Sequence, residues 1–168
     1  MFVSYFFGMI GGVRRRDQQL EPITFTQQGF DKLKKEREDL FTERKVVLER
    51  VKEARAMGDL SENGYYQAAK AKLRSIDHRL VRLGDLLKRG VVANPGKGTV
   101  GIGSKVMVKT ERETKTFHIV GKFEADPFSN KISHISPIGR ALMGKKDGDT
   151  VLIEVPNGTI AYTIIMVT

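Results

Sequence analysis

Asp59 and Glu62 are the residues of this chain whose type and spacing best suit chemistry. They stand three residues apart in Gly58-Asp59-Leu60-Ser61-Glu62-Asn63, between two long stretches with a helical pattern. This arrangement predicts the tip of a helical hairpin. Carboxylate oxygens are suitable ligands for Mg²⁺, but two carboxylates are too few to hold the ion without a partner. Such a metal would activate water for hydrolysis of a phosphodiester, so we predict half of a metal site that another molecule completes.

A capping box is the structural alternative for the same two residues. If the second helix begins at Asp59, its side chain accepts a hydrogen bond from the backbone amide of residue 62, and Glu62 reaches back. Acidic side chains are also favourable at the positive end of a helix. Spacing alone favours the capping box over the metal site, and both interpretations stay open at this point.

Two helices must position this tip, and the first is predicted to be long. Thr26 suits an N-cap, and Gly58 is typical of a residue just past a helix terminus. A helix of about 30 residues at about 1.5 Å each has a length of about 45 Å. Gly29 in its first turn costs about 1 kcal/mol relative to Ala. The second helix is expected to start within residues 59–61 and to end near Lys88.

Both stretches show the alternating three- and four-residue apolar steps of a coiled coil. We therefore predict that the two helices pack against each other along an apolar seam. The seam residues are Phe30, Leu33, Leu40, Val47, Val51 and Ala54, with Arg37 and Arg44 at the same phase, and then Tyr66, Ala69, Leu73, Ile76, Leu80, Leu83 and Leu87.

The chain is basic, with 29 Lys and Arg against 20 Asp and Glu, and residues 23–97 hold 17 and 11 of these. A basic balance favours nucleic acid or another polyanion as partner. Lys70 and Arg74 share a helix face, and Arg55 is expected at a similar distance from the tip, so a basic collar behind the acidic tip is predicted. These residues fit the solvated flanks of a coiled coil equally well.

Other kinds of site find little support. The chain has no Cys, which excludes disulfides and Cys-based zinc sites. His78, His118 and His134 lack a second ligand at metal-binding spacing, so structural roles are expected for them. No glycine-rich loop opens a helix after a strand, and Ser61 has no His or Lys base at helical spacing.

Residues 1–22 are expected to form a poorly ordered extension. Their apolar part, residues 1–13, is too short to span a bilayer of about 30 Å, and its Arg residues follow the apolar run instead of preceding it as in a secretory signal. A membrane-touching anchor is the less favoured alternative. We expect no membrane contact.

The second half of the chain changes to the two-residue period of strands. A linker is predicted over residues 94–98, and a hairpin turn at Asn157-Gly158. Ser136 and Pro137 suit the cap and first position of a short helix that Gly144 ends. We predict an α+β protein: a coiled-coil domain over 23–93 and an antiparallel sheet domain with one helix over 99–168. The predicted strands are 105–108, 116–120, 131–135, 151–155 and 160–164.

The tip sequence Gly58-Asp59-Leu60-Ser61-Glu62-Asn63, together with Ser136-Pro137-Ile138-Gly139-Arg140-Ala141-Leu142-Met143-Gly144-Lys145, resembles the bacterial Gre transcript-cleavage factors. The resemblance covers residues 23–168. It is closer to the GreA type than to the GreB type, since Leu60 stands where the GreB type usually has Arg. The chain departs from the usual pattern at Gly64 and Tyr65, where Ala and an acidic residue are common.

The resemblance implies an antiparallel coiled coil that enters the secondary channel of RNA polymerase and an FKBP-like C-terminal domain that docks on the enzyme. Asp59 and Glu62 match the tip pair that shares Mg²⁺ with the polymerase active site, with no cofactor bound by the free protein. The match also implies sites in both domains. Arg55, Lys70 and Arg74 are expected to contact the nascent RNA 3′ end in backtracked complexes, and Glu124, Asp126, Ser136 and Pro137 to dock on polymerase.

The resemblance therefore predicts a cytoplasmic, monomeric elongation factor that is no enzyme alone and stimulates RNA cleavage by the polymerase. One alternative is a related protein that occupies the same channel and modulates or inhibits polymerase without promoting cleavage. Another is a nucleic-acid-binding coiled coil unrelated to polymerase, which the basic collar would allow.

Overall fold

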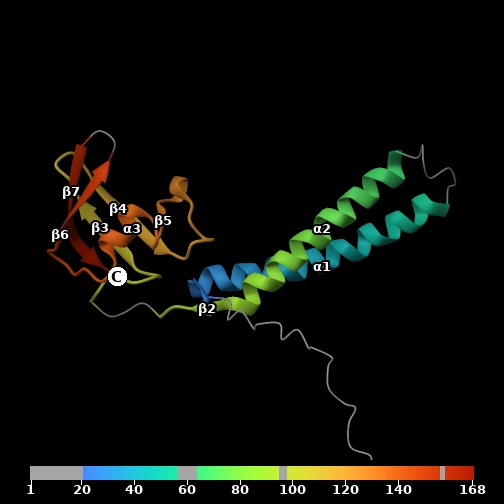
Figure 1. Ribbon diagram of the computed structural model, residues 1–168, viewed down its shortest axis with the longest axis horizontal. Helices are drawn as coiled ribbons and strands as arrows, with labels where there is room; N and C mark the ends of the chain where they lie inside the picture. Colours follow the sequence, from blue (N-terminus) through green and yellow to red (C-terminus); the bar gives the residue numbers. More distant parts are fainter. Residues whose placement is uncertain (1–20, 57–63, 95–97, 156–157) are drawn as a thin grey trace, which may run out of the picture.

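The N-terminal half is a long helical hairpin, as predicted (Figure 1). The computed structural model describes residues 21–56, 64–94, 98–155 and 158–168. Helix α1 spans Gln27–Ala56 and helix α2 spans Gly64–Arg89. The predicted N-cap is confirmed, because the Thr26 hydroxyl accepts a hydrogen bond from the Gly29 amide at 3.0 Å.

The hairpin is antiparallel, and ion pairs across it show the register. Glu36 of α1 pairs with Arg79 of α2, whereas Glu43, further along α1, pairs with Lys72, nearer the start of α2. Partners thus run in opposite directions along the two helices. These side chains are 34 to 57% exposed, so each pair contributes about 0 to 1 kcal/mol.

The apolar seam supplies the larger stabilisation, and its prediction is confirmed. Val47, Ala54, Ala69, Ile76 and Leu83 are buried, and the remaining predicted apolar positions are half-buried. Leu86 of α2 is also buried, at 6% exposed, and is not among the predicted seam positions. Of the two arginines at the seam phase, Arg44 is paired with Asp77 at 2.6 Å, and the buried Arg37 Nε has no hydrogen-bond partner in the described part of the chain.

Two short strands at the base of the hairpin are absent from the predictions. Strand β1, Ile23–Phe25, pairs in parallel with β2, Gly90–Val92, directly before α1 and after α2. Three residues are too few to show a two-residue period, so the pattern gave no signal. The pairing ties the two ends of the hairpin together, and Phe25 is fully buried there.

The C-terminal half is a five-stranded sheet with strand order β5-β4-β3-β7-β6. Its strands are β3 Lys105–Lys109, β4 Thr114–Val120, β5 Lys131–Ser133, β6 Thr150–Val155 and β7 Gly158–Val167. The prediction of an antiparallel sheet is wrong for one pair, because β4 and β5 are parallel. A parallel connection usually needs a dozen or more residues. The shorter connection, residues 121–130, is sufficient here because β5 pairs with β4 over only three residues.

The helix α3, Pro137–Leu142, packs against the sheet and confirms the α+β prediction. Its start is capped as expected, since the Ser136 hydroxyl accepts from the Gly139 amide at 3.0 Å. The chain leaves the helix through Gly144, which has φ of +74°. A 3₁₀ turn, η1 Pro127–Ser129, was not predicted. The core residues are Val100, Val106, Val108, Phe117, Ile119, Leu142, Val151, Ile153, Tyr162 and Ile164.

Candidate functional site

The paired carboxylates predicted for the tip, Asp59 and Glu62, lie outside the described residues. The helices that lead to them are described up to Ala56 and from Gly64. These helix ends lie at the end of the hairpin that points away from the sheet domain (Figure 1). The metal-site and capping-box interpretations of the pair both remain predictions.

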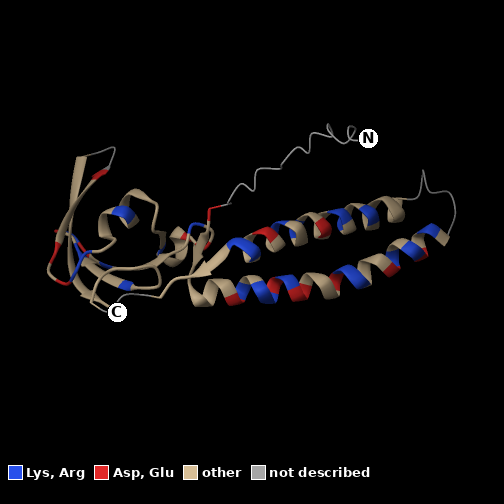
Figure 2. Ribbon diagram, turned by 60° about the horizontal axis from the view of Figure 1, so that its bottom comes forward, with Lys and Arg blue, Asp and Glu red and all other residues tan. Residues whose placement is uncertain are grey.

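The basic residues assigned to RNA are all exposed on the hairpin: Arg55 in the last turn of α1, and Lys70 and Arg74 on α2. Lys70 and Arg74 border a groove that Leu73, Asp77, His78 and Val81 also line. The Lys70 ammonium lies 5.7 Å from the centroid of the Tyr66 ring. A cation beside an aromatic ring is an arrangement that suits a phosphate and a base together. Lys and Arg residues are distributed along both helices (Figure 2).

The antiparallel register corrects the expectation of one collar. The pairs of Glu43 with Lys72 and of Arg44 with Asp77 place Lys70 level with residues 45–51 of α1. Arg55 is four to ten residues further along α1 than that level, which is about 6 to 15 Å at about 1.5 Å per residue. Arg55 is therefore nearer the tip than Lys70, and the basic residues form a track along the hairpin.

Two of the four residues assigned to docking hold backbone turns. Asp126 caps η1: its carboxylate accepts from the Ser129 hydroxyl at 2.6 Å and from the Phe128 amide at 3.2 Å. The hydrogen bond from the Ser129 side chain is the main cause of a lowered pKa of Asp126, and the backbone amides of this turn add to it. Ser136 caps α3, and the exposed Pro137 is its first residue. Asp126 and Ser136 thus shape the surface around them.

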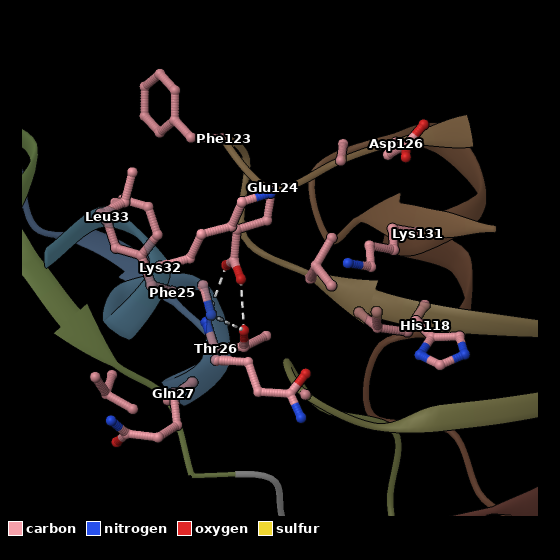
Figure 3. Close-up of a pocket in the computed structure, with 18 of the residues that line it drawn as sticks. Phe25, Thr26, Gln27, Lys32, Leu33, His118, Phe123, Glu124, Asp126 and Lys131 are labelled. Carbon is pink, nitrogen blue, oxygen red and sulfur yellow. Dashed lines mark hydrogen bonds between the residues drawn. The ribbon is translucent and has the colours of Figure 1, made fainter. Parts of the chain in front are cut away.

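Glu124 faces the hairpin. Its carboxylate accepts hydrogen bonds from the backbone amide and the hydroxyl of Thr26, at 2.9 and 2.5 Å (Figure 3). It also accepts a hydrogen bond from the Gly121 amide at 3.1 Å. In this arrangement of the two halves, both carboxylate oxygens of Glu124 accept hydrogen bonds from groups of this chain. In the sequence, Gly29 was the one indication of this contact. Glycine is unfavourable in the first turn of a helix, and the apolar pattern gives no reason for it at this position.

Phe128 is a further surface residue that sequence reasoning missed. It is fully exposed on the turn that Asp126 caps. Single exposed apolar side chains are common on protein surfaces, so the exposure of Phe128 alone does not define a contact surface. The signal in the sequence was Asp126-Pro127-Phe128, a capping residue and a proline directly before an aromatic residue.

A cavity of about 700 Å³ lies between the base of the hairpin and the sheet domain (Figure 3). Its lining is mixed in charge, with Lys32 and Lys131 as well as Glu124 and Asp126. Within the described ranges, no three His, Cys, Asp or Glu side chains are grouped so as to hold a metal ion.

The remaining described features point to no other kind of site. His134 places its Nδ1 3.2 Å from the Val120 carbonyl oxygen, which is a contact within the fold. Among the described helices none has the length and apolar character of a membrane span.

Comparison with known proteins covers both halves. Residues 23–92 match the family model of the N-terminal domain of the transcription elongation factor GreA/GreB, and residues 95–168 match that of the C-terminal domain. The chain is 42% identical over 151 residues to transcription elongation factor GreA of Caldanaerobacter subterraneus subsp. tengcongensis, covering 86% of this chain and 96% of the relative. It is 41% identical over 155 residues to GreA of Nitratiruptor sp., covering 89% and 94%.

The crystal structure of GreA factor homolog 1 from Thermus thermophilus aligns with 88% of this chain and 99% of its own, at 25% identity and a TM-score of 0.43. The family assignment rests on the two family models and on the curated relatives, which agree over nearly the whole described fold. This chain belongs to the GreA/GreB family of transcription elongation factors.

Proposed function

We propose that this GreA/GreB-family chain binds RNA polymerase, places its hairpin in the secondary channel and stimulates cleavage of backtracked nascent RNA. The observation that carries the proposal is the hairpin: two paired helices of 30 and 26 residues that lead to the acidic stretch. The first is about 45 Å long at about 1.5 Å per residue, which suits reaching a catalytic centre from an enzyme surface. The polymerase supplies that centre, in the cytoplasm.

The tip pair has a defined task in this proposal. Asp59 and Glu62 would contribute carboxylate oxygens to Mg²⁺ that is shared with the polymerase, because two carboxylates are too few to hold the ion in the free protein. The ion, when bound, supplies a water of lowered pKa and neutralises charge on the phosphodiester. The capping interpretation is compatible, since the same side chains can cap α2 before they meet the metal.

The basic track along the hairpin would hold the RNA. Arg55, Lys70 and Arg74 are exposed cations that form no ion pair with an acidic side chain in the described part of the chain. Lys72 and Arg79, by contrast, are already paired with acidic side chains. Cations without a carboxylate partner are suited to phosphate contacts, which position a strand without reading its sequence. The tip would therefore meet an RNA 3′ end that the track has aligned.

The C-terminal domain would dock on polymerase through the surface that Asp126, Ser136 and Pro137 shape. Phe128 adds a fully exposed aromatic side chain to this surface. Glu124 is part of the same loop, but its carboxylate is engaged by the hairpin. We assign docking to the capped turn and to the start of α3.

The test uses stalled, backtracked elongation complexes with Mg²⁺ and the purified protein. We expect the protein to shorten the RNA, and Asp59→Ala and Glu62→Ala each to abolish the shortening while binding is retained. The matched control is Asp39→Ala, which removes an exposed carboxylate from the same hairpin. Binding with blocked elongation and no shortening would instead identify a channel-binding inhibitor, and absence of binding would overturn the proposal altogether.

A further inference from the structure

A carboxylate of the C-terminal half binds the base of the hairpin. Glu124, in the loop after β4, reaches the base of the hairpin, where Oε2 accepts from the Thr26 amide at 2.9 Å and Oε1 from the Thr26 hydroxyl at 2.5 Å. Oε2 also accepts from the Gly121 amide of its own loop at 3.1 Å. Beside it, the Phe123 ring stacks on Phe25, with centroids 6.3 Å apart. Figure 3 shows Glu124 directed at Thr26.

Two glycines leave the room that this contact needs. A Cβ on Gly29 would lie 1.8 Å from Glu124 Oε1, so any side chain there displaces the carboxylate. A Cβ on Gly121 would lie 2.2 Å from the Thr24 carbonyl oxygen, so the loop approaches β1 this closely only with glycine. Glycine is unfavourable inside a helix. The seat for the carboxylate therefore explains a residue that is otherwise a cost to α1.

Thr26 links the carboxylate to the helix itself. Its hydroxyl donates to Glu124 and accepts from the Gly29 amide, so the same side chain caps α1 and holds the sheet domain. A negative charge at the first turn of a helix is also favoured by the helix dipole. Glu124 is therefore hydrogen-bonded to the N-terminus of α1.

We propose that Glu124 is a positioning residue whose carboxylate, seated over Gly29 and bonded to Thr26, fixes the direction of the hairpin relative to the C-terminal domain. We call Glu124, Thr26, Gly29 and Gly121 the Glu124 latch. The consequence for cleavage rests on the proposed function, because the latch matters there only if the hairpin delivers its tip to polymerase.

The length of the hairpin makes this direction decisive. With α1 about 45 Å long, a tilt of about 10° at its base moves the far end by about 8 Å. A misplacement of about 1 Å at a reacting centre already costs up to about 100-fold in rate. A docked C-terminal domain can place the tip reliably only if the base of the hairpin is held.

Interdomain distance in the free protein tests the latch without polymerase. The chain has no Cys, so spin labels at Val46→Cys on α1 and Leu152→Cys on β6 are unique, and both positions are exposed. We expect one narrow distance distribution with the latch intact and a broad one in Glu124→Ala. Loss of each hydrogen bond to the charged group shifts the ratio of latched to released protein by about 10- to 100-fold. Glu154→Ala, an exposed carboxylate on β6, is the control.

Gly29→Ala opens the latch without changing Glu124 and is the second variant. We expect it to broaden the distance distribution, and in the Glu124→Ala background to raise the thermal midpoint by about 2 to 4 °C, because Ala favours the helix once the seat is empty. Gly84→Ala is the matched control, since a Cβ there meets nothing within 4 Å. Narrow distributions in both Glu124→Ala and Gly29→Ala would overturn the proposal.

The cleavage assay then measures the consequence. With saturating protein, Glu124→Ala and Gly29→Ala should lower the maximal cleavage rate about tenfold or more. The half-saturating concentration should stay near that of the wild type, because the docking surface is unchanged. Broad distances with an unchanged maximal rate would overturn the positioning role. If the wild type stimulates no cleavage, the proposed function fails, and the distance measurements still decide whether the latch exists.

Discussion

Three side chains of the described residues hold backbone turns through short-range hydrogen bonds. Thr26, Asp126 and Ser136 each accept from an amide two or three residues ahead, and each begins a helical turn. Capping oxygens of this kind satisfy amides that have no partner inside the helix. At this scale the sequence was informative for Thr26 and Ser136, because a cap depends only on residues next to it in the chain.

Ser136→Ala should lower the free energy of unfolding of the C-terminal domain by about 0.5 to 2 kcal/mol. The substitution removes the oxygen that accepts from the Gly139 amide and the hydroxyl that donates to the Ser133 carbonyl oxygen at 2.7 Å. Denaturant unfolding measures the loss of stability. Ser136→Thr retains the hydroxyl and should lie near wild type, and equal destabilisation by both substitutions would contradict a capping role.

At the scale of elements, the hairpin depends on its apolar seam more than on its ion pairs. The side chains of the ion pairs between α1 and α2 are at least one-third exposed, whereas Leu83 has no exposed surface. Burying a Leu side chain contributes about 1.5 to 3 kcal/mol, more than an exposed ion pair does. The ion pairs instead favour the antiparallel register in which opposite charges meet.

Leu83→Ala should reduce the free energy of unfolding of the hairpin by about 2 to 5 kcal/mol, because it leaves a cavity in the seam. Val81→Ala is the matched control on the same helix. Val81 is 75% exposed, so its truncation should change stability by less than about 0.5 kcal/mol. Thermal unfolding followed by far-UV circular dichroism measures both, and similar effects of the two substitutions would rule out the seam as the main stabiliser.

At the scale of the whole molecule, a compact domain carries a long charged hairpin (Figures 1 and 2). Residues 23–97 hold 17 of the 29 Lys and Arg, so the basic surplus lies mainly on the hairpin side. Phosphate contacts release counterions and weaken as salt rises. The hairpin and the docking domain should therefore differ in salt dependence.

Lys70→Glu and Arg74→Glu should weaken binding to backtracked complexes and reduce the slope of log affinity against log salt by about one for each phosphate that is no longer neutralised. Titrations of labelled complexes over a series of salt concentrations measure the slope. Lys146→Glu, an exposed substitution in the C-terminal domain with the same charge change, is the control. An identical slope change for Lys146→Glu would mean that net charge, and no track on the hairpin, is responsible.

Local patterns predicted much of this fold, and their failures have physical causes. The heptad spacing predicted both helices, and the two-residue period predicted the five strands of the large sheet. The two-residue period did not predict β1 and β2, since three residues are too few to show it. The parallel direction of β4 and β5 was not predicted, because local sequence does not determine which strands pair. The positions of Arg55 and Lys70 along the hairpin depend on the register between the two helices, and residue spacing within one helix does not determine that register.

The sequence by itself determined the hairpin, its N-terminal cap, the change to strands after residue 98, and the family resemblance, because each depends on residues close together in the chain. The tip residues Asp59 and Glu62 remain predictions of the sequence. Only the tertiary structure decided that Glu124 faces Thr26, 98 residues away, and that Gly29 leaves room for it. The sequence does not show whether a carboxylate faces solvent or another domain, because its hydrogen-bond partner depends on how the two halves pack.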